Sequence, residues 1–393
     1  MALRLTFCEW RGMPTLDVTT PLDWETIEQA LPGGWRELAV ERKLIGRKLP
    51  PHLGAKVQDI GMAMRLALYQ VATNSGLEAT TAAFAAAGLV DISFVALHKW
   101  MKKLGPYMQE LLGQMVRGEH AVFAPEVWAG YEVVVTDASC VERPGAKGTT
   151  ARLHYALRLT DLRAVEAHIT DHTGGETLRR FQPEIDQLWI CDRGYSNAPS
   201  IAHATQRNAA VLIRLNRGAL PLYDVHGRVV DVREKLGRLG KSGRAREWNV
   251  CVHPNEGDAI EGRLVAVRLP PEKAAAARKR VRDEHGAKAS EEQLWMAEFV
   301  VLITTVPPSK LTAEQLVELY RLRWQVELEF KPAKSLLGLD RLPNFLPETI
   351  VSWIAAKMLL HQILRAVAAR SSFDAFPPCA IGQALLASPS RAA

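Results

Sequence analysis

The first third of the chain carries apolar residues at helical spacing. The segment VQDIGMAMRLALYQVA (57–72) predicts one helix, and residues 74–105 predict two more, separated by a break at Gly88. The residues before this region are mixed, with Pro and Gly interruptions. We therefore expect an N-terminal helical domain over residues 1–122.

The two helices predicted on either side of Gly88 resemble a helix-turn-helix. Ser93 is placed to cap the second helix. This helix carries three basic residues, Lys99, Lys102 and Lys103. Such a pair is more often ordinary helical packing, so both interpretations stay open. If the pair is a helix-turn-helix, the N-terminal domain binds DNA.

Beyond residue 122 the pattern changes to β-branched runs and to alternation of apolar and polar residues. The run YEVVVTDAS stops at Asp137, and DQLWICDRGYS contains a strand that ends at Asp192. The predicted elements are three neighbouring strands, then helix, strand, helix and strand, at 131–137, 153–159, 164–171, 175–183, 186–191, 198–209 and 210–216. This order predicts a mixed sheet flanked by helices, an α/β fold.

Residues 218–296 break this alternation. Their apolar runs predict the strands of a separate small β unit, followed by a basic, Ala-rich helix at 271–286. The three strand-like runs lie at 221–232, 246–253 and 261–270. A buried strand at 296–306 and a helix from Thr312 to Lys331 then restore the alternation.

These changes of pattern divide the rest of the chain into three parts. Residues 123–217 form the first part of an α/β core, and residues 218–296 form a β-rich insertion. Residues 297–393 form the second part of the core together with C-terminal helices. No internal repeat is present in the sequence.

The composition is that of an ordinary soluble protein, with 48% hydrophobic and 23% charged residues. Five scattered cysteines without a C-x-x-C pair predict reduced thiols in a cytoplasm. The N-terminal residues lack the apolar stretch of a signal peptide. The longest apolar run, IVSWIAAKMLLHQIL, is interrupted by Lys357 and predicts a buried helix rather than a membrane span. We therefore expect a cytoplasmic protein without a membrane partner.

The positive charge is concentrated in one segment. Residues 214–246 contain nine Lys or Arg and three Asp or Glu, so this segment accounts for the whole net charge of +6. A concentrated basic segment favours a polyanionic partner, because contacts with phosphates release counterions. A basic surface that only keeps the protein soluble would have the same composition.

Three carboxylates stand where a site could form. Asp137 and Asp192 each end an apolar strand, and Glu327 lies on the helix that follows the last strand. Three carboxylates that converge at a sheet edge supply hard oxygen ligands for Mg²⁺ or Mn²⁺. Two such ions, roughly 4 Å apart, support displacement at a phosphodiester. A single strand-end Asp is usually a turn former, but two of them beside a one-sided Glu helix favour a site.

Four polar side chains fall on one stripe of that last helix. Each helical residue advances by roughly 100°, so offsets of three, seven and fourteen residues stay within roughly 60° of the first. The four are Tyr320, Arg323, Glu327 and Lys334. A solvated helix face would show the same pattern. Pro332 removes a helical N–H and should kink or end the helix, so Lys331, on the same stripe, is the substitute for Lys334.

These motifs together resemble the DDE transposases of bacterial insertion sequences, in the IS-four-like group. The segments VVVTDAS and CDRGYS resemble the motifs of the first and second Asp. YRLRWQVE with FKPAK resembles the Tyr-x₂-Arg-x₃-Glu-x₆-Lys signature. The resemblance covers about 133–344 in order, and the N-terminal third matches only in its helical character.

The resemblance implies an RNase H-like core with a β-rich insertion between the second Asp and the Glu. It implies that Asp137, Asp192 and Glu327 are catalytic and bind two Mg²⁺ ions, for which Mn²⁺ can substitute. It also implies contacts with DNA phosphates from the polar residues of the signature helix, Tyr320, Arg323 and Lys334, with Lys331 as the substitute.

The implied function is that of a transposase. Such an enzyme binds the terminal inverted repeats of an insertion sequence and catalyses metal-dependent cleavage and strand transfer, in cut-and-paste transposition. Its partner is double-stranded DNA, both transposon ends and target, and we expect a homodimer in the synaptic complex. Two alternatives stay open at this point: an RNase H-fold nuclease without strand transfer, and a domesticated protein that binds DNA without cutting it.

Overall fold

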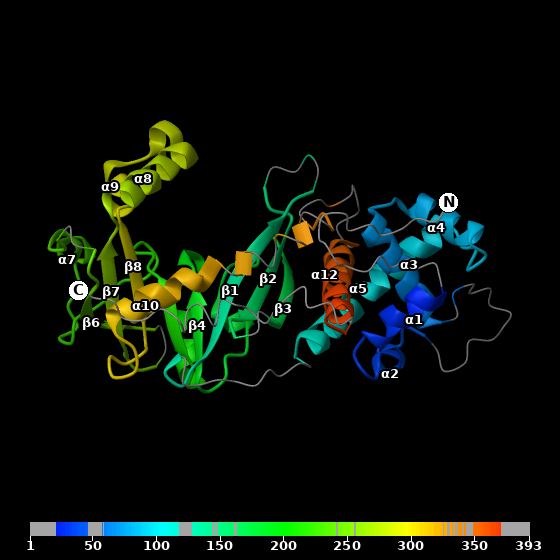
Figure 1. Ribbon diagram of the computed structural model, residues 1–393, viewed down its shortest axis with the longest axis horizontal. Coiled ribbons are helices and arrows are strands. Elements are labelled where there is room, and N and C mark those ends of the chain that lie inside the picture. Colours follow the sequence, from blue (N-terminus) through cyan, green and yellow to red (C-terminus); the bar gives the residue numbers. More distant parts are fainter. Residues whose placement is uncertain are drawn as a thin grey trace.

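The computed structural model has helices at one end and a β-sheet at the other (Figure 1). The parts of the chain that it describes are residues 21–45, 57, 59–117, 128–143, 145, 148–160, 163–240, 243–254, 257–324, 326–327, 331, 333–334, 337–339, 342 and 349–370. The helix α10 (Ala313–Arg321) crosses the sheet and leads from its outer strands towards its centre (Figure 1).

The helical end combines N-terminal and C-terminal segments. Its helices are α1 (Pro21–Gln29), α2 (Trp35–Glu41), α3 (Ile60–Thr73), α4 (Leu77–Ala86), α5 (Phe94–Arg117) and α12 (Ile350–Arg370). The predicted break at Gly88 is confirmed, with φ +68° at this glycine. The Ser93 hydroxyl accepts a hydrogen bond from the Ala96 N–H at 3.2 Å, as its predicted capping role requires.

The C-terminal helix α12 is a core helix. The window Ile350–Val367 is long and apolar enough to cross a membrane, but 78% of it is buried inside the protein. It packs mainly against α5 and also against α3, and α5 in turn packs on strand β3 (Arg163–Asp171). The helix predicted around Lys357 is therefore confirmed, and it packs on the N-terminal helices α5 and α3.

Lys357 is fully buried in α12. Its ammonium donates hydrogen bonds to Asn74 Oδ1 at 2.7 Å, to the Gly338 carbonyl at 2.8 Å and to the Leu337 carbonyl, and it lies over the Trp353 ring. These acceptors come from the end of α3 and from the segment that follows Glu327. One buried cation thus ties the helical domain to the segment that follows a predicted active-site residue.

Replacing Lys357 by Met should lower the free energy of unfolding. The change keeps the length of the side chain but leaves buried acceptors without a donor, at about 1–3 kcal/mol for each. Urea unfolding followed by circular dichroism measures the effect. Lys99→Met, at an exposed position of α5, is the matched control and should stay within about 0.5 kcal/mol of wild type. Equal midpoints for the two variants would contradict this role of Lys357.

All eight strands that the structure describes lie in a single mixed sheet. Their order across it is β3-β2-β1-β4-β5-β8-β7-β6. The remaining strands are β1 (Glu132–Val141), β2 (Ala151–Arg158), β4 (Gln187–Cys191), β5 (Ala210–Arg214), β6 (Arg246–Val252), β7 (Ile260–Arg268) and β8 (Phe299–Thr304). Strands β1, β4 and β5 are parallel, and the other pairs are antiparallel. The predicted mixed α/β architecture is confirmed.

The separate β unit predicted within residues 218–296 is wrong. Strand β7 pairs with β8 from Arg263↔Thr304 to Arg268↔Phe299, so β6 and β7 extend the main sheet. Strand β8 pairs with β5 on one side only. Without β7 its other edge would be free, so the pairing with β7 satisfies the backbone N–H and C=O groups of that edge. The helices α8 (Pro271–His285) and α9 (Glu291–Met296) project from this end of the sheet (Figure 1).

Two shorter predictions also need correction. Residues 221–232 form isolated bridges at Tyr223 rather than a strand, and they lead into helix α7 (Val232–Gly237), which Asp231 caps. The helix predicted at 175–183 is only a 3₁₀ turn, η3 (Leu178–Arg180). In the first segment, a turn from Asp224 to Gly227 ends the regular pattern early; in the second, the Thr177 side chain caps a turn of only three residues.

The two faces of the sheet have separate cores. Along β1, Val133 and Val135 face one core, which also contains Leu316 from α10. Val134 faces the other core, which contains Trp189 and also Ile201 from α6 (Ala198–Gln206). This alternation follows from the two-residue period of a strand. Helices α10 and α6 therefore cover opposite faces of the sheet.

Candidate active site

Asp137 and Asp192 lie in one cross-strand row. The parallel pairing of β1 with β4 runs from Glu132↔Gln187 to Val135↔Ile190. Asp137 and Asp192 each come two residues after the last pair, so the same register places them opposite each other. Neighbouring strands are about 4.8 Å apart. Two carboxylates are thus presented side by side beyond the end of the parallel ladder.

Strand β1 does not stop at Asp137, contrary to the sequence prediction. It continues to Val141 because β2 still pairs with it on the other side, from Asp137↔Tyr155 to Val141↔Ala151. Only its parallel partner β4 ends. Asp137 is therefore held by a continuous strand, which fixes its side chain more firmly than a loop would.

Asp192 directly follows β4, as predicted. It caps a 3₁₀ turn, η4 (Arg193–Tyr195), and its Oδ1 accepts a hydrogen bond from the Gly194 N–H at 2.9 Å. The second carboxylate oxygen is not used in this cap. One oxygen thus orients the side chain, and the other remains available for a ligand.

The helix predicted from Thr312 to Lys331 is interrupted. Helix α10 begins with a capping box of Thr312 and Gln315, but it ends at Arg321, and a 3₁₀ turn, η6 (Leu322–Trp324), follows. The sequence predicted a break at Pro332. The observed break comes earlier in the chain, before Glu327. Because a 3₁₀ turn has three residues per turn, a single 3.6-residue stripe does not extend through this segment.

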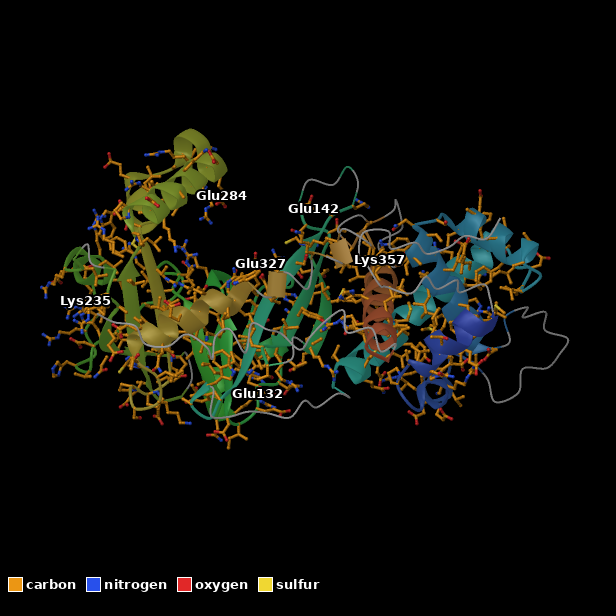
Figure 2. All side chains as sticks on the ribbon, in the orientation of Figure 1. Glu132, Glu142, Lys235, Glu284, Glu327 and Lys357 are labelled. Atoms are coloured by element: carbon orange, nitrogen blue, oxygen red, sulfur yellow. The ribbon has the colours of Figure 1, made fainter. Side chains whose placement is uncertain are left out.

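Arg323 nevertheless connects the strand that carries Asp137 with the segment that carries Glu327. Its Nη1 lies 3.2 Å from Asp137 Oδ2, and its Nη2 lies 2.7 Å from Glu327 Oε1. The side chains of Asp137 and Arg323 are 18% and 20% exposed, whereas that of Glu327 is 56% exposed. Figure 2 shows Glu327 beside the central strands of the sheet. The guanidinium thus forms a bridge between a partly buried and an exposed carboxylate.

The groups around Asp137 shift its pKa in opposite directions. Burial raises the pKa of Asp137, and the charges of Asp192 and Glu327 raise it further. Arg323 and the Ala138 N–H, which donates to Asp137 Oδ1 at 2.8 Å, act in the opposite direction on this pKa. All three predicted carboxylates therefore interact electrostatically at one place.

Tyr320 belongs to the same site. Burial raises its pKa to about 12, while the nearby Arg323 and Arg214 lower it and Asp192 raises it. Among the residues predicted to contact DNA, Lys331 has an exposed side chain and Lys334 a partly exposed one. The structure thus brings Tyr320 and Arg323 to the carboxylates and places both lysines farther along the chain.

Sequence reasoning counted Arg214 in the basic segment 214–246 but missed it as a residue of this site. The β4–β5 register runs from Leu188↔Ala210 to Cys191↔Ile213, so Arg214 continues the row of Asp137 and Asp192. Burial lowers the pKa of Arg214, and so do Arg193 and Arg323. Its Nε is buried without a hydrogen-bond partner among the described residues. Its place at the end of the strand after Asp192 was the signal that could have identified it.

A second missed residue is Glu176, in the loop between β3 and η3. Burial raises its pKa to about 7, and the charges of Asp192 and Asp137 contribute, whereas Arg152 lowers it. A Cβ on Gly194 would coincide with Glu176 Oε2. This fourth carboxylate therefore lies against the turn that carries Asp192. No sequence motif distinguishes it from other loop glutamates.

The donor set suits a hard divalent cation. The described residues contain no group of three Asp, Glu, His or Cys side chains close enough to hold one ion directly. Mg²⁺ tolerates this arrangement, because it keeps several water molecules and binds through one or two carboxylates. The Arg323 guanidinium now supplies the positive charge between Asp137 and Glu327. These oxygens would fit Mg²⁺ or Mn²⁺ and offer no soft ligand.

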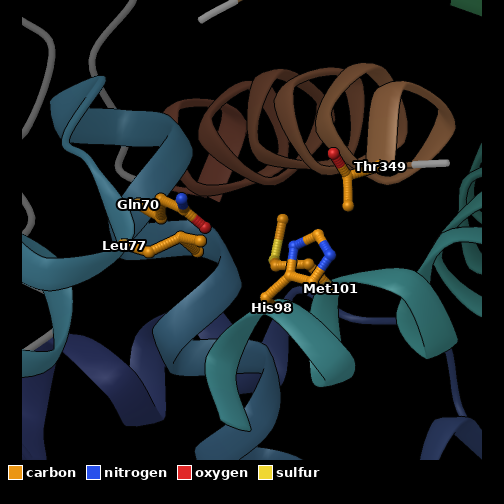
Figure 3. A pocket seen from close by; sticks show the side chains of 5 residues that line it. All are labelled: Gln70, Leu77, His98, Met101 and Thr349. Atoms are coloured by element: carbon orange, nitrogen blue, oxygen red, sulfur yellow. The ribbon is translucent and has the colours of Figure 1, made fainter. Parts of the chain in front are cut away.

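A small hollow at the helical end lies apart from this site. It is lined by Gln70, Leu77, His98, Met101 and Thr349, between α3, α4, α5 and the start of α12 (Figure 3). The amide of Gln70 is fully buried and has no hydrogen-bond partner within the described parts of the chain. The lining contains no carboxylate, and we assign it no chemistry.

Comparison with known proteins identifies the family. The model for the transposase DDE domain matches residues 128–362. The transposase for insertion sequence element IS421 of Escherichia coli is 30% identical over 338 residues, which cover 83% of this chain and 89% of that protein. The transposase for insertion sequence element IS231F of Bacillus thuringiensis subsp. israelensis is 26% identical over 204 residues, which cover 47% of this chain and 42% of that protein.

A third relative covers as much of the chain as the first. The putative transposase InsL for insertion sequence element IS186A of Escherichia coli strain K12 is 30% identical over 337 residues, or 83% of this chain and 89% of that protein. The family match contains the whole sheet together with α10 and the Glu327 segment. The chain belongs to the DDE transposases of insertion sequences, which cleave DNA and transfer its strands with the help of divalent metal ions.

Proposed function

We propose that Asp137, Asp192 and Glu327 are the catalytic triad of this transposase and that they hold two Mg²⁺ ions, for which Mn²⁺ can substitute. The observation that carries the proposal is the shared cross-strand row of Asp137 and Asp192, together with the Arg323 bridge from Asp137 to Glu327. The parallel order of β1, β4 and β5 beside antiparallel β2 and β3 supports an RNase H-like core.

The metal ions would activate the attacking oxygen and stabilise the leaving oxygen of each displacement at phosphorus. The chain's own residues position the DNA. Arg323 has a planar fork of N–H donors that fits a phosphate, and Tyr320 has a hydroxyl that can donate to one. Arg214 adds positive charge in the same row, and Lys331 and Lys334 contact the flanking DNA.

One triad serves both steps of cut-and-paste transposition. Water attacks at the terminal inverted repeat first, and the liberated 3′-hydroxyl then attacks the target. Both ends of the element must be held at once, so we propose a homodimer in the synaptic complex. An assay with end-containing DNA and Mg²⁺ tests the function: joined products support it, cleavage alone indicates a nuclease, and binding alone indicates a domesticated protein.

Tyr320 should not act as a nucleophile. Because its pKa is raised to about 12, it is protonated at neutral pH. Both displacements use water or a 3′-hydroxyl, so no covalent protein intermediate is needed. Tyr320→Phe should therefore retain measurable cleavage that still requires Mg²⁺ or Mn²⁺. The measurement is a reaction quenched in denaturant and examined for protein attached to labelled DNA. A phosphotyrosine adduct, or cleavage undiminished by EDTA, would overturn the metal-based assignment.

The basic segment 214–246 should govern general DNA affinity only through its unpaired residues. Lys235, Arg244 and Arg246 form no ion pair with the described residues. Replacing all three by Gln should flatten the slope of log K against log salt by roughly 0.9 for each phosphate that the variant no longer neutralises. Fluorescence anisotropy with a labelled duplex at several salt concentrations measures this slope.

The matched control neutralises two arginines of the same segment that are already paired. Arg228 lies 3.2 Å from Asp224, and Arg238 forms an ion pair with Glu234. The double variant R228Q/R238Q removes two charges rather than three, so the change of slope is compared per charge removed; its positions already have carboxylate partners. We expect a smaller change of slope than for the three unpaired residues. Equal slopes for wild type and the triple variant would mean that this surface faces solvent.

A further inference from the structure

Glu176 is a carboxylate without an evident structural role. It is only partly exposed, and among the described residues no Lys or Arg nitrogen lies within ion-pair distance of it. Its charged neighbours include two carboxylates, Asp192 and Asp137. Like charges brought together in a partly desolvated place are unfavourable unless a cation joins them. An ordinary surface glutamate would turn into solvent instead.

The surrounding chain fixes the position of Glu176 from both sides. Before it, the carbonyls of Gly174 and Gly175 accept hydrogen bonds from Arg152 at 3.3 Å and from Arg180 at 3.2 Å. After it, the Thr177 hydroxyl lies 3.2 Å from Ser200 Oγ. Ser200 also accepts from the Leu178 N–H at 3.1 Å, so α6 anchors this side. The chain on either side of Glu176 is thus held in place, which limits where its side chain can lie.

The contact of Glu176 with the Asp192 turn requires a glycine. Gly194 has no side chain, and a Cβ there would coincide with Glu176 Oε2. The N–H of the same glycine donates to Asp192 Oδ1 at 2.9 Å. One residue thus orients the Asp192 carboxylate with its N–H and, by lacking a Cβ, leaves room for the Glu176 carboxylate.

We propose that Glu176 is a fourth acidic residue of the catalytic centre and helps to hold its divalent cations, as an addition to the Asp137, Asp192 and Glu327 triad of the proposed function. It acts on the Asp192 side of the site, where its carboxylate lies against Gly194. Because Mg²⁺ retains water in its coordination sphere, Glu176 can hold the ion through a water molecule as well as directly.

The test is a Mn²⁺ titration of the DNA-free full-length protein, followed by the electron paramagnetic resonance signal of the free ion. Glu176→Gln removes the charge and keeps the shape, and it should weaken Mn²⁺ affinity by about 10- to 100-fold. Glu184→Gln is the matched control, because Glu184 lies exposed on the same connection between β3 and β4. This control should bind Mn²⁺ like wild type. Circular dichroism confirms that each variant is folded.

Gly194→Ala provides a second, independent variant. It leaves all four carboxylates and the N–H bond to Asp192 in place, but its Cβ displaces the Glu176 carboxylate. We expect Mn²⁺ affinity to fall as in Glu176→Gln. The double variant G194A/E176Q should be no weaker than E176Q, because both changes remove the same interaction.

The outcomes separate this inference from the proposed function. If Asp137→Asn and Glu327→Gln weaken Mn²⁺ binding while Glu176→Gln binds like wild type, the assignment of Glu176 to the metal centre is wrong. The proposed triad then stands without it. If none of these variants changes Mn²⁺ binding, the proposed metal centre fails as a whole. Weakening in Glu176→Gln and Gly194→Ala, with Glu184→Gln unchanged, supports Glu176 as a metal-binding residue.

Discussion

Asp137→Asn, Asp192→Asn and Glu327→Gln are each expected to abolish strand cleavage while DNA binding persists. Metal-ion catalysis supplies several kcal/mol of transition-state stabilisation, so losing a coordinating oxygen should lower the rate at least about 10³-fold. The amide variants keep the shape of the side chain and remove one negative charge. A nicking assay on end-containing DNA with Mg²⁺, beside a gel-shift assay on the same DNA, measures both quantities.

The control for this prediction is Glu318→Gln, in α10. Glu318 pairs with Arg321 on the exposed side of the helix, and its side chain is 64% exposed. An exposed ion pair of this kind contributes about 0–1 kcal/mol, so cleavage should stay near wild type. Wild-type-like nicking by any one of the three triad variants would remove that residue from the proposed site.

Arg323→Ala is expected to have two opposite effects. In the DNA-free protein, Arg323 neutralises Asp137 and Glu327, so its removal should strengthen the binding of Mn²⁺ to those carboxylates. With DNA present, removing the guanidinium that binds a phosphate should slow cleavage by about 10²- to 10³-fold. The two measurements are a Mn²⁺ titration of the free protein and single-turnover cleavage of end-containing DNA.

Arg323→Lys separates the charge of this residue from its geometry. A lysine ammonium is a point charge without the planar fork that bridges two groups, so we expect incomplete rescue of cleavage. A lysine variant that cleaves like wild type would mean that Arg323 supplies only charge. An alanine variant with unchanged Mn²⁺ affinity would mean that the Arg323 bridge does not compete with the metal.

The order of the elements and the candidate site residues followed from local pattern. Helical spacing in 57–105 predicted α3, α4 and α5, and β-branched runs predicted the strands up to β5. Asp192, Glu327 and Arg323 stood out because strand ends and fixed helical offsets are local properties. The family resemblance rested on the same short motifs, and the comparison with known transposases confirmed it.

Long-range pairing decided what the local pattern could not. Nothing in the runs at 246–253 and 261–270 shows whether they pair with each other alone or also with β8, because the alternation of a strand is the same in both cases. Strand β1 continues past Asp137 because β2 still pairs with it on the side away from β4. The η6 turn ends α10 early, although the sequence continues with apolar residues at helical spacing.

The sequence by itself determined which residues could do the chemistry, because carboxylates, an arginine and a tyrosine are visible as letters at given spacings. Only the tertiary structure decided which of them meet. The β1–β4–β5 register aligned Asp137, Asp192 and Arg214, and the β3–η3 loop brought Glu176 onto Gly194. The physical reason is that register and loop packing depend on contacts between residues far apart in the chain, which no local pattern records.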